Sequence, residues 1–165
     1  MGFTYQLKKE SDTPSFLMGF SANVLEKTKF ETKTYTKRLK GYRVFVTSFY
    51  TVDPIVFLLN ASYGINLKKE FKDTLVDNAN ILTVSPQVYF AVNPYTSLNW
   101  GVKYTNYGEN EVDNKQISSS GSSVSFLMGM SYEFSSKTTF NMNVESLHTN
   151  DATQSTVSTN LSYKF

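Results

Sequence analysis

The sequence predicts an all-β protein, an antiparallel up-and-down transmembrane β-barrel with about nine strands in this chain. Three observations predict this fold. Apolar and polar residues alternate along most of the chain, short turns alternate with long polar loops, and aromatic residues gather near the ends of the alternating segments. We expect residues 1–165 to form a single domain.

Alternation marks the strands of the N-terminal half in chain order. Phe3, Tyr5 and Leu7 alternate with polar residues, and the even residues from Phe16 to Val24 are all apolar. Two further segments alternate in the same way on either side of a Val-Asp-Pro turn. The predicted strands are 2–9, 15–25, 41–52 and 55–68.

The C-terminal half continues the same period. The even residues are apolar in "ILTVSPQVYFAVN", in "SLNWGVKY" and in "VSFLMGMSYEF", and the last residues, "VSTNLSYKF", end the chain on an aromatic side chain. The predicted strands are 81–93, 97–107, 124–134, 138–148 and 155–165.

The connections differ in length in a regular way. "SDTP", "VDP", "NPYT" and "SSKT" are short and rich in turn-forming residues, whereas the segments between them, such as "EKTKFETKTYTKRLK" and "YGENEVDNKQISSSGSS", are long and polar. We therefore expect all tight turns at one end of the sheet and all long loops at the other.

Alternation alone does not tell which row of side chains faces inward. A soluble β-sandwich or a lipocalin-like barrel that binds an apolar ligand alternates too, with its apolar row inside. Strands of about ten residues, the asymmetry of the loops and the aromatic strand ends favour an apolar row that faces lipid. This arrangement puts the short turns in the periplasm and predicts a bacterial outer-membrane location.

The predicted strand count is odd, whereas bacterial single-chain barrels have an even number of strands with both termini in the periplasm. Met1 also leads directly into "GFTYQLKKE", without the basic and apolar regions of a signal peptide. We expect either that strands are missing at the N-terminus or that the sheet closes with other chains. The oligomeric state stays open.

Several segments resemble the outer-membrane "transporter" barrels of phenol-degradation (meta-pathway) operons and of the functional-amyloid exporter. The similar stretches are "GFTYQLKKESDTPSFLMGFSANV", "VDPIVFLLNASYGIN" and "VNPYTSLNWGVKYTN". Members of that family are barrels of about twelve strands, so the resemblance implies that this chain is the C-terminal part. It also implies passage of small solutes or secreted subunits through the outer membrane.

Charged residues on the polar rows are candidates for the lining of a pore. Sparse charges of mixed sign predict weak ion selectivity, although opposite charges could also pair across the lumen and serve the structure alone. These candidates are Arg43, Lys103, Glu133, Glu145 and Lys164.

Two other groups of residues point to partners. Basic residues in the loop after the second strand are candidates for contact with lipopolysaccharide, or are simply solvated: Lys33, Lys37, Arg38 and Lys40. The alternating C-terminus resembles the signal that the barrel-assembly machinery reads, which would act through Tyr163 and Phe165.

Composition excludes several kinds of chemistry. The chain has no cysteine, which excludes disulfides and thiolate metal sites, and its net charge of +2 argues against nucleic-acid binding. His148 is the only histidine, and no catalytic spacing surrounds it, so we expect neither an enzyme nor a metal or cofactor. The leading hypothesis is a channel, and the main alternative is a non-conducting surface anchor or adhesin.

Overall fold

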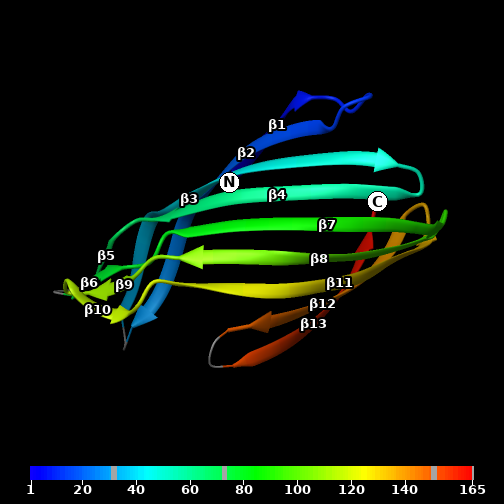
Figure 1. The fold of residues 1–165 in the computed structure, drawn as a ribbon. Helices are drawn as coiled ribbons and strands as arrows, with labels where there is room; N and C mark the ends of the chain where they lie inside the picture. The colour runs from blue at the N-terminus through cyan, green and yellow to red at the C-terminus, as the bar shows by residue number, and fades with distance from the viewer. Residues whose placement is uncertain (31–32, 72–73, 150–151, 165) are drawn as a thin grey trace.

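The computed structural model describes residues 1–30, 33–71, 74–149 and 152–164, with the side chains of residues 25–38 and 71 outside the described set. The chain folds into two antiparallel β-sheets, one large and one small (Figure 1). In the described part of the chain, no helix is long and apolar enough to cross a membrane.

The large sheet has nine strands in up-and-down order, as the alternation predicts. Each strand pairs antiparallel with the next one of the sheet, so hairpin follows hairpin from one edge to the other (Figure 1). The strands are β1 (Gly2–Lys8), β2 (Ser15–Phe30), β3 (Lys33–Val52), β4 (Ile55–Asn66), β7 (Ile81–Asn93), β8 (Thr96–Tyr107), β11 (Gly121–Ser135), β12 (Thr138–His148) and β13 (Thr153–Tyr163).

The two outermost strands stand at the ends of this order and are exposed along their whole length. Within the described residues, β1 pairs with β2 and β13 pairs with β12, and no pairing joins β1 to β13. The nine strands therefore form a curved sheet with two edges.

The connections separate as predicted. The β1–β2, β3–β4, β7–β8 and β11–β12 turns lie at one end of the sheet, here called the turn end, and the other connections lie at the loop end (Figure 1). Side chains fix the turns locally: Tyr95 N donates to Asn93 Oδ1 at 2.9 Å, and Thr51 Oγ1 donates to Glu10 Oε2 at 3.2 Å. The Glu10 contact ties the first turn to β3.

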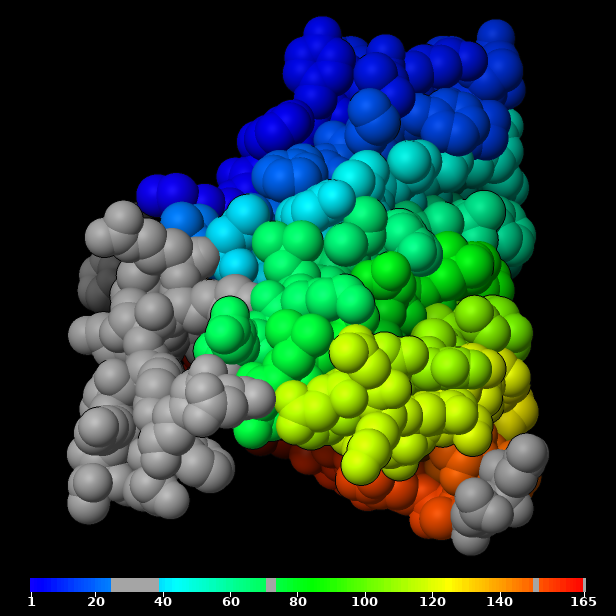
Figure 2. All heavy atoms as spheres, turned by 90° about the vertical axis from the view of Figure 1, so that its left-hand side faces the viewer, coloured from blue at the N-terminus to red at the C-terminus, as the bar shows by residue number. Residues whose placement is uncertain are grey.

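The loop end corrects one prediction, because two of the long connections are folded. β5 (Lys69–Phe71), β6 (Thr74–Asp77), β9 (Asn110–Val112) and β10 (Lys115–Ser118) form a second, four-stranded sheet. The hairpins β5–β6 and β9–β10 join through Val76 and Val112, which are register partners. They lie against each other in Figure 2, in green and yellow-green.

The β9–β10 turn has a clear sequence cause. Asp113 and Asn114 both have positive φ, 51° and 59°, as a two-residue type I′ hairpin turn requires, and Asp and Asn tolerate this region better than most residues. Strands of three or four residues are too short to show a reliable alternation, so the sequence predicts only polar loops here.

The described residues of the predicted loop, 26–30 and 33–40, are also strand. β2 and β3 continue past the large sheet as a long hairpin, and the register shifts between Asn23 and Leu25. Leu39 has a φ of 69° at this irregularity, which is a β-bulge. Beyond it both strands bend away from the direction of their neighbours (Figure 1).

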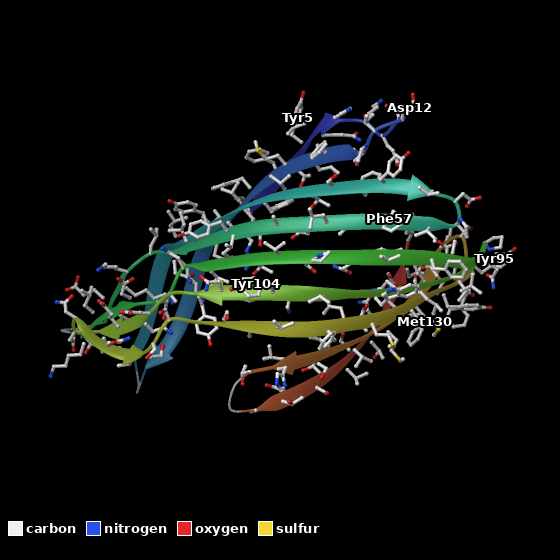
Figure 3. All side chains as sticks on the ribbon, in the orientation of Figure 1. Tyr5, Asp12, Phe57, Tyr95, Tyr104 and Met130 are labelled. Atoms are coloured by element: carbon white, nitrogen blue, oxygen red, sulfur yellow. The ribbon has the colours of Figure 1, made fainter. Side chains whose placement is uncertain are left out.

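Burial distinguishes the two faces of the large sheet. On β11, Ser125 and Gly129 are buried, whereas Phe126 and Met128 between them are 61% and 67% exposed. Other strands repeat this pattern, and Figure 3 labels three exposed members of the apolar row, Tyr5, Phe57 and Tyr104. We call the apolar side the outer face and the polar side the inner face.

This pattern overturns the soluble alternatives. A sandwich or a lipocalin-like barrel buries its apolar row, but among the described residues the only buried apolar side chain of this chain is Ala79. The exposed apolar row needs a partner other than water, and lipid provides it.

Candidate functional site: the inner face of the large sheet

The inner face of β7–β13 carries mostly amides and hydroxyl groups. Because register partners in a sheet point to the same side, one row crosses five neighbouring strands. We call it the amide row: Tyr89, Asn99, Gly129, Asn143 and Ser158.

A recess of about 230 Å³ lies on this face, beside the amide row. Hydrogen bonds hold one of its walls, since Tyr89 Oη donates to Gln87 Oε1 at 3.1 Å and Gln87 Nε2 donates to Ser85 Oγ at 3.2 Å. The polar side chains that line the recess are Gln87, Asn99, Asn143, Glu145, Thr156 and Ser158.

The structure brings together two of the predicted pore-lining residues. Lys103 Nζ on β8 forms an ion pair with Glu145 Oε1 on β12, across the intervening strand β11. Both side chains are about one-third exposed, at 31% and 35%. The pair neutralises the charge on this part of the inner face.

The other three predicted pore-lining residues lie apart from this pair. Arg43 is on the inner row near the loop end, in register with Gly64. Glu133 and Lys164 are exposed at the turn end. Within the described residues, no ion pair joins any of these three to a partner.

The inner face of β2–β4 has a different character, which the sequence analysis missed. Phe45 and Phe49 fall on the inner row of β3 and are half-buried, and Leu58 of β4 is the register partner of Phe49. A Cβ atom at the buried Gly19 would overlap the ring of Phe45. The sequence does contain an indication of this packing, because both phenylalanines stand out of phase with the apolar row of "YRVFVTSFYTV".

The predicted lipopolysaccharide contacts fall mostly outside the described side chains. This holds for Lys33, Lys37 and Arg38, whose backbone belongs to β3. Lys40 is half-buried at the loop end, and its carbonyl oxygen accepts a hydrogen bond from Leu67 N at 3.0 Å.

The predicted assembly signal is described only in part. Tyr163 is exposed at the turn end, where it is the register partner of Thr138. Phe165 lies outside the described residues.

An ion pair also joins the segment that follows β4 to the last residue of β6 in the small sheet. Lys68 Nζ lies 2.9 Å from Asp77 Oδ2. The hydrogen bond from Lys68 to Asp77 raises the pKa of the Lys68 ammonium group above its usual value of 10.5.

Comparison with protein families gives a match over nearly the whole chain. The family model described as "Outer membrane protein beta-barrel domain" matches residues 2–165. Comparison with curated proteins gives no match.

Among solved structures, the chain is similar to OmpTdeltaL8, the loop L8 deletion mutant of OmpT, an outer membrane protein of Vibrio cholerae. The TM-score is 0.54 and the sequence identity is 13%, over 93% of this chain and 50% of that chain. The chain thus spans about half the length of the structure it matches, and the likeness concerns the fold alone.

The comparison also corrects the expectation that the protein is not an enzyme. That expectation rested on the lack of a catalytic spacing in the sequence. The likeness to OmpT places the chain on an outer-membrane barrel fold, and a fold does not determine whether its loops or walls carry catalysis. The exclusion of an enzyme is therefore withdrawn.

Proposed function

The chain belongs to the outer membrane protein beta-barrel domain family, and from this premise we propose that it forms a channel through the bacterial outer membrane. In this proposal residues 1–165 belong to one barrel domain, which further strands or other chains complete at the two sheet edges, with the outer face in lipid and the inner face lining a water-filled passage. The solutes are small molecules or secreted subunits.

One observation carries the proposal, the distribution of polar groups over the two faces. A plugged or solid barrel would pack its inner face. On the inner face of β7–β13 the hydroxyl groups of Ser85 and Ser125 are buried, but amides such as Asn143 and the neutralised Lys103–Glu145 pair remain exposed or partly exposed. Such a wall suits water and hydrated solutes. The resemblance to transporter-type barrels supports the same function.

Within this proposal the predicted residues have distinct roles. Lys103, Glu145 and Arg43 line the passage, and Glu133 and Lys164 stand at its periplasmic mouth. The loop end faces outward, where Lys40 and its neighbours Lys33, Lys37 and Arg38 meet lipopolysaccharide. Tyr163 and Phe165 serve recognition by the assembly machinery.

Conductance tests the channel directly. The full-length protein, purified in detergent and inserted into planar bilayers, should give stepwise currents in KCl. Well-folded protein that inserts without conducting would contradict the proposal.

The small sheet at the loop end favours one second candidate, a surface anchor or adhesin. Two loops that pair as β-strands present a defined surface, which a passive pore does not need. Two results together would favour this candidate. The protein would insert into bilayers without giving a current, and bacteria that carry it would attach to host cells or surfaces only when residues 110–118 are present.

A further inference from the structure

The recess beside the amide row contains hydrogen-bonding groups that the fold leaves unused. Asn99 and Asn143 flank Gly129 from the two neighbouring strands, and their Oδ1 atoms lie within 2.5 Å of the position that a Cβ atom of residue 129 would take. Among the described residues, neither amide has a hydrogen-bond partner. The absence of a side chain at Gly129 therefore lets two free amides converge.

The recess is also electrically neutral. Its one ionised group, Glu145, is paired with Lys103, and its other polar groups are amides and hydroxyls. An ion finds no unpaired opposite charge there. A neutral solute with several hydroxyl groups finds both donors and acceptors, because each amide carries both and each hydroxyl can act as either.

The size of the recess sets an upper limit on the solute. Its volume of about 230 Å³ corresponds to roughly eight water molecules at about 30 Å³ each. A small solute can displace this water and replace its hydrogen bonds.

We propose that the recess beside Gly129 is a binding subsite for small neutral polyhydroxylated solutes, that is, sugars, on their way through the channel. This inference rests on the proposed channel function and names the class of solute. Asn99 and Asn143 make the hydrogen bonds to the sugar, Thr156 and Ser158 complete the wall, and the Lys103–Glu145 pair keeps the site neutral.

Glucose and glucuronate are suitable probes because they share a ring and differ by one carboxylate. The full-length protein in planar bilayers is titrated with each, and sugar-induced current fluctuations give the half-saturating concentration. The same titration in detergent, followed by saturation-transfer NMR of the sugar, reports binding without reference to conductance. We expect saturable glucose binding and no tighter binding of glucuronate.

The structure supplies a matched pair of variants. In Gly129→Ala the new methyl group displaces both amides, whose ends can swing aside, and lies 3.1 Å from the backbone oxygen of Met142, whereas in Gly64→Ala the nearest atom is 3.7 Å away. Gly129→Ala should raise the half-saturating glucose concentration about tenfold, as expected for the loss of one or two hydrogen bonds. Gly64→Ala should leave it unchanged.

A second variant protects the test against misfolding. Asn99→Leu with Asn143→Leu keeps the side-chain size and removes the amides, and its glucose binding should fall at least as far as that of Gly129→Ala.

Each outcome has a distinct meaning. A wild-type channel that conducts but shows no saturable glucose binding overturns the sugar subsite and leaves the channel standing. Tighter binding of glucuronate, or equal glucose binding by Gly129→Ala and wild type, also overturns it. Absence of conductance overturns the channel function, and with it this inference.

Discussion

The two halves of the large sheet share an outer face but not an inner one. The outer row is apolar from β1 to β13, with residues such as Phe3, Val46 and Leu161 exposed. On the inner side, β2–β4 contribute aromatic and aliphatic groups that pack on small residues, as Phe45 does on Gly19. The inner side of β7–β13 contributes amides around Gly129.

The difference shows which face the membrane constrains. Lipid demands the same apolar chemistry around the whole circumference, because an exposed polar group in hydrocarbon lacks partners. The inner face carries no such general demand, so one half can stabilise the sheet with apolar groups while the other keeps amides and charged groups.

The largest expected effect tests whether the outer face is equivalent in both halves. Met128→Arg on β11 and Val46→Arg on β3 should each destabilise the protein by about 2–4 kcal/mol, the range for a basic residue near the bilayer midplane. Urea unfolding in lipid vesicles, followed by the fluorescence of the single Trp100, measures this. Ser131→Arg on the inner row is the control and should cost less than about 1 kcal/mol. If only one of the two outer-face substitutions is strongly destabilising, the outer face is not equivalent in the two halves of the sheet.

The next effect contrasts the inner faces. Gly19→Ala should lower the free energy of unfolding by about 2 kcal/mol, because its methyl group meets the ring of Phe45. Gly129→Ala should cost less than about 1 kcal/mol, since amide ends move more easily than a packed ring. Adding Phe45→Leu to Gly19→Ala should restore part of the loss. Equal costs at both glycines would show that the two inner faces are packed alike.

Charge substitutions separate the paired from the unpaired part of the wall. Glu145→Gln leaves Lys103 without its partner, so the reversal potential in a KCl gradient should shift toward anion selectivity, and Lys103→Gln should shift it toward cations. Arg43→Gln in the other half should also shift it toward cations. The stability of Glu145→Gln should change by less than about 1 kcal/mol, because the pair is partly exposed. If none of the three substitutions changes the ion selectivity, these residues do not line the proposed passage.

The smallest effect concerns the small sheet at the loop end. Asp77 raises the pKa of Lys68, so the ion pair is fully formed below pH 10.5 and is lost as the pH rises through the higher pKa of the folded state. The chain has no cysteine, so Ile117→Cys accepts a single spin label on β10. Its mobility should increase with pH above 10.5, and Lys68→Met should abolish this step. If Lys68→Met shows the same increase in label mobility with pH, the increase arises from the titration of another group.

The sequence predicts the large sheet well and the inner face in part. Period-two alternation over about ten residues is long enough to reveal a membrane strand, which is why the nine strands and the two ends of the sheet are confirmed. Alternation does not predict the strands of the small sheet, because each has only three or four residues: β5, β6, β9 and β10. Their pairing depends on contacts between distant loops.

The site shows the same limit. The polar rows identify Lys103 and Glu145 as inner-face residues, but their pairing across β11 requires the strand register, which alternation does not contain. The convergence of Asn99 and Asn143 depends on the glycine between them in the same way. Phe45 and Phe49 stand out of phase with the continuous apolar row of their strand, so alternation alone does not predict that they pack on the inner face.

Under the proposed orientation, in which the loop end faces outward, the pairing of β6 with β9 has a consequence for recognition by antibodies. Because Val76 and Val112 come from different loops and share one sheet, the antigenic surface they support is discontinuous in sequence. Antibodies against the native surface should therefore recognise neither loop as a linear peptide.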